Sequence, residues 1–428
     1  MKANVFVTRG AQGMADNTHS PARRWLDAET HHHWLTREGL RLLEFHRQAR
    51  LPSGGFAPLD GDGRIPEGAG ADTMITGRMA HSYGLAAMQG VPGAASLAEH
   101  AIRALSGLLR DEKDGGWLAG DPAMTADRTK QCYLHHFVAL GAATARQAGI
   151  PGSAALLDEV VEVIETRFWS EDEQAFVERY AQGWRELADY RGGNSNMHGV
   201  ELCLALADVR DEPHWLDRAL AIVERLIHRH AAPRDHRILE HFHGDWAEWP
   251  DYNVEQPHHD FYPYGATPGH GFEWSRLMLH LEAALEARGR DAPTWLFADA
   301  AALFEASLRD GWAPDGAPGL VYTVDWQGQP SSRRRRHWTH AEALAAASAF
   351  LQRTGEAHYE RWYRHLWDFL DTTFIDRVRG SWQQELDHRL AIDPEQGDVK
   401  PDLYHAYQAT LLPRLPLAPA LAVAVERL

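Results

Sequence analysis

The stretch ALAAASAF, residues 343–350, combines helical spacing with an almost unbroken run of small side chains. Two other segments share this character, HSYGLAAM at 81–88 and FVALGAATA at 137–145. A helix that is apolar on all sides and rich in alanine and glycine is typical of a buried position where backbones pack closely. These segments therefore predict helices that lie inside a larger helical assembly.

Helical periodicity continues outward from these segments along most of the chain. Charged amphipathic stretches such as DEVVEVIETRF, 158–168, alternate with the small-residue segments, and clusters of proline and glycine separate them. We expect helices near residues 22–49, 73–90, 94–111, 126–148, 153–168, 194–208, 213–230, 267–288, 293–309, 334–353, 356–375 and 402–413.

Twelve helices in six pairs predict an all-α fold, the (α/α)6 barrel, in which six inner helices are enclosed by six outer ones. The apolar, even-numbered helices suit the inner ring. Short β-hairpins are expected on the loops at 173–180, 319–326 and 380–387. We assign residues 22–428 to a single catalytic domain and residues 1–21 to a disordered N-terminal tail.

Composition excludes several classes of protein. The formal net charge of −17 over 428 residues argues against a nucleic-acid or anionic-membrane partner. The sequence contains no apolar stretch near the roughly 18–20 residues of a membrane span. Its two cysteines, Cys132 and Cys203, fit a reducing compartment. We expect a cytoplasmic protein that acts on a small molecule, and a homodimer is compatible with the sequence.

Polar and aromatic residues recur near the starts of the predicted inner helices. The inner helices of such a barrel run parallel, so their N-terminal ends meet at one rim. The repetition at equivalent places predicts a common pocket. Its candidate residues are Arg78, His81, Tyr133, Asn194, His198, Glu201, His270, Glu273, Trp274, Trp338, Glu342, Tyr404, His405 and Gln408.

Two of these helices carry a His-x-x-Glu pair, His198 with Glu201 and His270 with Glu273. A carboxylate one turn along the helix can accept one ring proton, fix the tautomer and leave the other nitrogen for a substrate. Such a pair can also bind zinc or iron. We assign no metal, because di-iron bundles use the order Glu-x-x-His and zincins use H-E-x-x-H. The four arginines at 333–336 are expected to form a solvated rim.

Five motifs resemble the N-acylglucosamine 2-epimerase superfamily, in order and at similar spacing from about residue 22 onward. They are TGRMAHSY (76–83), GGNSNMHGVE (192–201), PYGATPGHGFEWSRL (263–277), HWTHAEAL (337–344) and KPDLYHAYQA (400–409). The resemblance implies an (α/α)6 barrel and epimerisation or aldose–ketose isomerisation of sugars without a cofactor. The GATPGH loop and the PDLYHAYQA ending most resemble the bacterial isomerases of mannose and related sugars, which include the sulfoquinovose isomerases.

The resemblance also implies roles for single residues. His405 is expected to shuttle the carbon-bound proton, and His270, oriented by Glu273, to open the sugar ring. His198 and Arg78 are expected to bind O1 and O2 and to stabilise the enediolate, with Glu201 steadying His198. The remaining candidates would shape the pocket or contact the sugar: Trp274, Trp338, Tyr133, Asn194, Asp260 and Gln408.

The substrate is expected to be an uncharged sugar. Relatives that bind sulfosugars are expected to carry an arginine just before the counterpart of His270, whereas residues 251–269 contain no lysine or arginine and include Asp260. D-Mannose to D-fructose is favoured, with D-lyxose to D-xylulose as a second conversion. The alternatives are a 2-epimerase of the mannose/glucose or cellobiose type and a sulfoquinovose isomerase. More remote are a glycoside hydrolase, which needs two facing carboxylates, and a binding module without catalysis.

Overall fold

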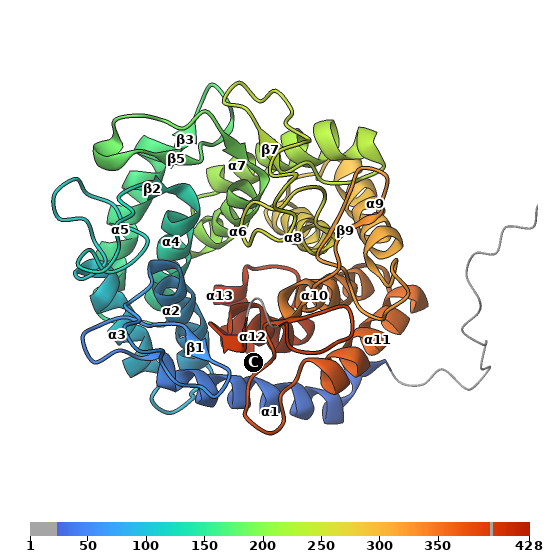
Figure 1. Ribbon diagram of the computed structural model, residues 1–428, viewed down its shortest axis with the longest axis horizontal. Helices are drawn as coiled ribbons and strands as arrows, with labels where there is room; N and C mark the ends of the chain where they lie inside the picture. The colour runs from blue at the N-terminus through green and yellow to red at the C-terminus, as the bar shows by residue number, and fades with distance from the viewer. Residues whose placement is uncertain (1–23, 394–396) are drawn as a thin grey trace, which may run out of the picture.

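Two concentric rings of helices form most of the computed structural model, which describes residues 24–393 and 397–428 (Figure 1). The inner ring consists of α2 (Thr73–Met88), α4 (Cys132–Gln147), α6 (Gly193–Val209), α8 (Pro268–Ala287), α10 (His337–Thr354) and α12 (Tyr404–Leu411). The outer ring consists of α1 (Glu29–His46), α3 (Ala94–Ser106), α5 (Ser153–Val163), α7 (His214–Val223), α9 (Thr294–Gly311) and α11 (Ala357–Thr373). The tail expected at 1–21 lies outside the described residues.

The inner ring is closed, because each inner helix packs against the next and α12 returns to α2. Each outer helix from α3 to α11 packs against the inner helix that precedes it, and α1 packs against α12. This arrangement confirms the predicted (α/α)6 barrel and the assignment of the even-numbered helices to the inner ring.

Glycine allows the closest approach within the inner ring, between α2 and α4. A Cβ atom on Gly77 would lie 2.6 Å from the carbonyl oxygen of Phe137, and one on Gly141 would lie 2.6 Å from the carbonyl oxygen of Gly77. Real Cβ atoms do not approach backbone this closely, so both positions require glycine. The glycine and alanine content that predicted the inner helices thus has a direct packing cause.

Several helices differ in length from their predicted spans. Helices α4 and α10 begin six and three residues later than expected, because Lys130–Gln131 and Arg335–Arg336 are strands. After α5 and α7 the chain widens into π-helical turns at Ile164–Phe168 and Glu224–Ala231, which complete the predicted spans. Amphipathic periodicity continues through such turns, so sequence spacing does not reveal where the α-helix ends.

The strands are two or three residues long and pair in antiparallel fashion. The pairs are β1 (Leu59–Asp60) with β12 (Val399–Lys400), β2 (Lys130–Gln131) with β5 (Arg179–Tyr180), β3 (Trp169–Ser170) with β4 (Ala175–Phe176), β6 (Arg191–Gly192) with β7 (His241–Phe242), β8 (Thr323–Val324) with β9 (Pro330–Ser332), and β10 (Arg335–Arg336) with β11 (Glu385–Leu386). Among the named strands of the described residues, two pairs are local hairpins, β3–β4 and β8–β9, and they overlap in part with the hairpins predicted at 173–180 and 319–326. The hairpin predicted at 380–387 is wrong, because that segment contributes β11, which pairs with β10. The other pairs join loops that are about 50 or more residues apart.

These longer-range pairs position the starts of the inner helices. The residue or strand before each inner helix pairs with a loop that follows the next outer helix, for example β2 with β5 and β6 with β7. Single bridges do the same before α2, at Asp72 and Gly120, and before α8, at Ala266 and Val324. At the end of the chain β12 pairs with β1 and closes the circle. All six inner helices therefore begin at one rim of the barrel.

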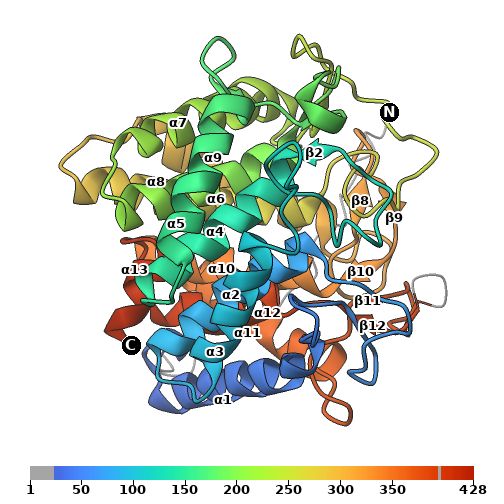
Figure 2. The same cartoon turned by 90° about the vertical axis from the view of Figure 1, so that its left-hand side faces the viewer.

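Different elements cover the two ends of the barrel. Figure 2 shows the strands at one end and the short helix α13 (Leu421–Ala424) at the other. Helix α13 packs against α4 and α6, where it covers the ends of the inner ring opposite the strands. Within the part of the chain that the structure describes, no helix is long and apolar enough to cross a bilayer.

Candidate active site

A cavity of about 250 Å³ opens at the rim where the inner helices begin. Drug-sized ligands occupy pockets of roughly 300–1,000 Å³, so this cavity suits one sugar ring. Most of the residues that the sequence predicted for a common pocket lie in its wall. They are Arg78, Tyr133, Asn194, His198, Asp260, His270, Glu273, Trp338 and His405.

His270 is oriented by Glu240 and not, as predicted, by Glu273. The Nδ1 atom of His270 donates to Oε1 of Glu240 at 2.7 Å, and both side chains are buried. Burial alone would raise the pKa of Glu240, but the charge of His270 and their hydrogen bond lower it below its usual value. Glu240 remains ionised, and Nε2 of His270 is the ring nitrogen left for a ligand.

His405 has an equivalent carboxylate partner. Its Nδ1 atom donates to Oε1 of Glu342 at 2.9 Å, while Nε of Arg276 donates to Oε2 of the same carboxylate at 2.9 Å. Burial would raise the pKa of Glu342, but the positive charge of Arg276 and the hydrogen bond from His405 lower it. The ring of Trp338 lies between the two histidines, with its centroid 5.0 Å from that of His270 and 5.7 Å from that of His405.

His198 is paired with Glu201, as predicted. Its Nδ1 atom lies 3.1 Å from Oε2 of Glu201, and the hydroxyl of Tyr404 also donates to this carboxylate. Burial lowers the pKa of His198 to about 4, so the ring is neutral at pH 7. A neutral ring that donates through Nδ1 presents Nε2 as an acceptor, which suits a sugar hydroxyl.

Arg78 enters the cavity wall beside aromatic rings and one carboxylate. Its guanidinium donates to Oδ2 of Asp402 at 2.9 Å and to the hydroxyl of Tyr133 at 2.9 Å. It lies 4.4 Å from the ring centroid of Phe137 and 4.9 Å from that of Tyr404. Burial would raise the pKa of Asp402, but Arg78 lowers it to about 2, so the ion pair persists at neutral pH.

Glu273 is a buried acid in the cavity wall. Its side chain is 1% exposed, and neither carboxyl oxygen has a hydrogen-bond partner among the described residues. Burial and the negative charge of Glu342 raise its pKa well above the usual value. A raised pKa favours the protonated carboxyl, which can donate a hydrogen bond. Glu273 lies 3.8 Å from Nδ1 of the neutral His198 and 3.9 Å from Nη2 of the charged Arg276.

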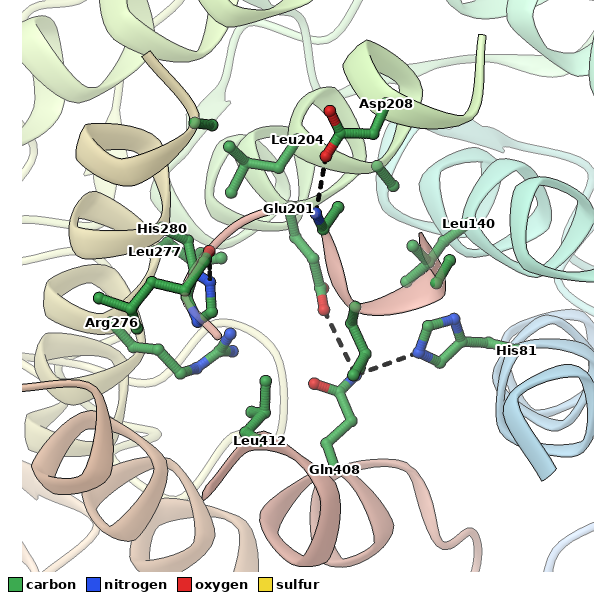
Figure 3. Close-up of a pocket in the computed structure, with 16 residues that line it drawn as sticks. His81, Leu140, Glu201, Leu204, Asp208, Arg276, Leu277, His280, Gln408 and Leu412 are labelled. Atoms are coloured by element: carbon green, nitrogen blue, oxygen red, sulfur yellow. Dashed lines mark hydrogen bonds between the residues drawn. The ribbon is translucent and has the colours of Figure 1, made fainter. Parts of the chain in front are cut away.

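Two predicted sugar contacts lie elsewhere. Gln408 lines a smaller cavity of about 40 Å³ deeper in the barrel, where its amide approaches Glu201 and His81 at 3.4 Å each (Figure 3). Arg276 and His280 line the same deep cavity, and Gln408 contacts Glu201, the partner of His198, from this side. Trp274 is 1% exposed and belongs to the hydrophobic core, because its position on α8 faces away from the rim.

Three of the four arginines at 333–336 are buried and do not form the solvated rim that was predicted, whereas Arg333 is exposed. Arg334, Arg335 and Arg336 are each less than 9% exposed. Arg335 forms an ion pair with Asp315, and Arg336 lines the cavity, where it donates to Oδ1 of Asp260 at 2.6 Å. Because successive side chains of a strand point to opposite faces, Arg335 and Arg336 of β10 have different surroundings.

Two groups of side chains have metal-ligand spacing within residues 24–393 and 397–428. They are His198 with Glu201 and Glu273, and Glu273 with Glu342 and His405. In both groups the histidine already bonds a carboxylate, and the guanidinium of Arg276 lies within 4 Å of Glu273 and Glu342. Arg276 therefore supplies positive charge where a cation would otherwise do so.

Sequence reasoning missed Glu240, Arg276, Arg336 and Asp402 as parts of the site. Glu240 lies on the loop before β7, 30 residues from His270, and its backbone carbonyl accepts from the amide of Gly193 at 2.8 Å. No local pattern connects it with His270. Asp402 and Arg276 do lie inside quoted motifs, and a charged residue close in sequence to a predicted site histidine could have identified them as parts of the site.

The rim thus contains three carboxylate-backed imidazoles, an arginine ion pair and a buried acid of raised pKa around a cavity for one small ring. Histidines held in one tautomer by ionised carboxylates are proton-transfer groups, and fixed donors stabilise an oxyanion that develops between them. Fold and site together define a class of barrel proteins that move protons on sugar-sized substrates.

The sequence pattern of N-acylglucosamine 2-epimerase (GlcNAc 2-epimerase) matches residues 54–409, and the chain belongs to this family. It is 52% identical over 413 residues to a D-mannose isomerase of Pseudomonas cannabina pv. alisalensis, covering 96% of this chain and 100% of that protein. It is 48% identical over 407 residues to a D-mannose isomerase of Thermobifida fusca, covering 94% and 98%.

Solved structures agree with this assignment. A crystal structure of a D-mannose isomerase superposes with a TM-score of 0.82 at 26% identity, covering 92% of this chain and 99% of that one. The cellobiose 2-epimerase of Spirochaeta thermophila superposes with a TM-score of 0.76 at 20% identity, over 90% and 95%, which shows a shared fold.

Proposed function

We propose that this protein is an aldose–ketose isomerase that interconverts D-mannose and D-fructose, with D-lyxose and D-xylulose as a second pair. One observation carries the proposal: two histidines in one sugar-sized cavity, His270 and His405, each donate Nδ1–H to a buried carboxylate. The near full-length similarity to D-mannose isomerases supports mannose as the aldose.

The reaction begins with opening of the pyranose ring. His270 takes the proton of the O1 hydroxyl and returns a proton to O5, so that the C1 aldehyde forms as the C1–O5 bond breaks. Glu240 supports this exchange because its ionised carboxylate stabilises the charged imidazole that forms in between. Trp338 supports it by packing its ring against His270.

Proton transfer between carbons follows. His405 removes the proton from C2 while O1 gains a proton, which gives a cis-enediol. His405 then returns a proton to C1 on the same face of the enediol, which matches the proton it took from C2. O2 loses a proton in this step, which matches the proton that O1 gained, and the product is the ketose. Glu342 and Arg276 keep Nε2 of His405 as the basic nitrogen throughout.

The C2–H bond of an aldose is weakly acidic, so the charge that develops on O1 and O2 needs stabilisation. Arg78 supplies a fixed positive charge, held by Asp402 and Tyr133. His198 accepts from a sugar hydroxyl, and the protonated Glu273 donates to a sugar oxygen. These groups are oriented before the substrate arrives, so little reorganisation accompanies the reaction.

The test is incubation of the protein with D-mannose in heavy water, followed by NMR of the products. We expect D-fructose, with deuterium at C1 to the extent that His405 exchanges its proton with solvent. D-Glucose as the main product would assign the protein to the 2-epimerases. Release of reducing ends from an oligosaccharide, without conversion of mannose, would overturn the proposal in favour of a hydrolase.

A further inference from the structure

We propose that Asp260 makes the cavity selective for uncharged sugars by occupying the guanidinium of Arg336, which would otherwise bind an anionic substituent. The inference rests on the proposed function, since it states which sugars the same cavity accepts. Its starting point is the permanent positive charge of Arg336 in the wall of a cavity assigned to a neutral sugar.

Arg336 is held in place without any help from Asp260. Its side chain is 5% exposed, its guanidinium lies 3.9 Å from the ring centroid of Tyr322, and it forms an ion pair with Glu385. Its backbone belongs to β10, which pairs with β11. A guanidinium fixed in this way is a preorganised site for a phosphate, sulfonate or carboxylate group.

The second carboxylate that pairs with Arg336, that of Glu385, is shared with another arginine. Glu385 also forms an ion pair with Arg334 at 3.1 Å, and Arg334 forms a further ion pair with Asp393. Two arginines and these two buried carboxylates balance in charge, and Asp260 adds one negative charge to the cavity wall. An anionic sugar therefore meets repulsion from Asp260 before it can reach Arg336.

Asp260 differs from Glu385 in exposure and in what holds it. Its side chain is 54% exposed, whereas that of Glu385 is 3% exposed. The hydroxyl of Tyr322 donates to the backbone carbonyls of His259 and Asp260 at 2.9 and 3.1 Å, and the guanidinium of Arg336 reaches the carbonyl of His258 at 3.3 Å. The loop is therefore anchored through its backbone, and removal of the Asp260 carboxylate leaves its anchors intact.

Loss of that carboxylate would free one strong donor. Nη2 of Arg336 is the atom that donates to Oδ1 of Asp260 at 2.6 Å. An oxyanion on a bound sugar would take the same position and replace one charge-assisted hydrogen bond with another. The structure therefore assigns to Asp260 the role of a built-in carboxylate that blocks an anion site.

The test compares binding of D-mannitol and D-mannitol 6-phosphate, which are not isomerised, by calorimetry. We expect Asp260→Ala to raise the affinity for D-mannitol 6-phosphate relative to D-mannitol at least tenfold over the wild type, and the gain to shrink with added salt. Asp251→Asn is the matched control, because Asp251 is an exposed residue of the same loop and its removal changes the net charge equally. This control is expected to leave the ratio unchanged.

A second variant tests whether the gain in affinity requires the guanidinium of Arg336 or follows from the change in net charge alone. The double variant Asp260→Ala/Arg336→Met is expected to lose the gain. An unchanged affinity ratio in Asp260→Ala, or an equal gain in Asp251→Asn, overturns the inference even if the wild type makes fructose from mannose. A wild type that makes no fructose, combined with the expected shift in ratio, overturns the proposed function and leaves the selectivity of the cavity standing.

Discussion

Two groups of buried histidines lie near the starts of the inner helices, and they differ in their hydrogen-bond partners. His270 and His405 line the cavity and donate Nδ1–H to Glu240 and Glu342. His135 and His340 point instead toward the loops behind the ring. Each donates Nδ1–H to a backbone carbonyl, of Gln131 and Arg336, and accepts a backbone amide through Nε2, from Trp117 and Leu320.

Position along the helix distinguishes His198, which lines the cavity, from the backbone-bonded His135 and His340. Five inner helices, α2, α4, α6, α8 and α10, each follow one residue in extended conformation, namely Asp72, Gln131, Gly192, Thr267 and Arg336. Counting from that residue, positions two and six supply seven residues of the cavity wall: Met74, Arg78, Tyr133, Asn194, His198, Glu273 and Trp338. His270 lines the cavity from position three. Position four supplies the side chain that bonds the neighbouring loop: Thr76, His135, Asn196 and His340.

The helical repeat explains the contrast. Successive residues are turned by about 100° around the axis, so positions two and six face the same way and position four faces the opposite side. A histidine backed by a carboxylate can accept and release a proton, while one bonded on both nitrogens to backbone has no free nitrogen. Residue type alone therefore does not identify a catalytic histidine here.

The largest effect is expected from replacing the carboxylate-backed histidines. His270→Ala and His405→Ala should each lower kcat by about 10²- to 10⁴-fold, the contribution of a positioned acid or base. Fructose formation measures kcat, and thermal unfolding should show an intact fold. If His135→Ala loses turnover to the same extent while remaining folded, the contrast between the two groups is wrong.

The carboxylate partners come next. Glu240→Gln and Glu342→Gln should lower kcat by about 10- to 100-fold, because the amide cannot stabilise the charged imidazole and can select the wrong tautomer. Glu273→Gln should lose less, since burial and Glu342 raise the pKa of Glu273 and so favour a neutral carboxyl, which the amide resembles. Steady-state kinetics of the three variants decides the matter. A larger loss in Glu273→Gln than in Glu240→Gln would restore Glu273 as the partner of His270.

The backbone-bonded histidines should affect stability. His340→Ala leaves the amide of Leu320 buried without its acceptor, which costs about 1–3 kcal/mol of unfolding free energy, with a further loss from the cavity created. Denaturant unfolding measures the change, and kcat well below the unfolding temperature should be near that of the wild type. A stable His340→Ala variant with low kcat would place His340 in the catalytic group.

The smallest effect concerns the pH dependence of stability. Burial lowers the pKa of His340 to about 3, below the roughly 6.5 of the unfolded chain. The unfolded state therefore binds more protons between these values, and stability falls as the pH is lowered through about 6.5. His340→Gln offers an amide acceptor to Leu320 but does not titrate, so its Tm should fall less steeply than that of the wild type from pH 7 to pH 5. Equal slopes would show that His340 is already protonated in the fold.

Much of this protein could be predicted from particular residues. Small side chains in 81–88, 137–145 and 343–350 indicated inner helices, because only small residues permit the approach seen between Gly77 and Gly141. The motifs around Arg78, His198, His270 and His405 indicated one shared site, because parallel inner helices must begin at one rim. Local periodicity and the geometry of a closed ring are both present in the sequence.

Tertiary structure decided the partners. Glu240 reaches His270 from a loop 30 residues away, and Arg276 reaches Glu342 from a neighbouring helix. Arg336 was expected in solvent and lies in the cavity wall, because β10 pairs with β11 and carries it inward. Hydrogen bonds and ion pairs act over about 3–4 Å between segments that are distant along the chain. The sequence alone thus indicates which helices form and many of the residues that face the rim, whereas the charge and tautomer of each group follow from contacts that exist only once the ring has closed.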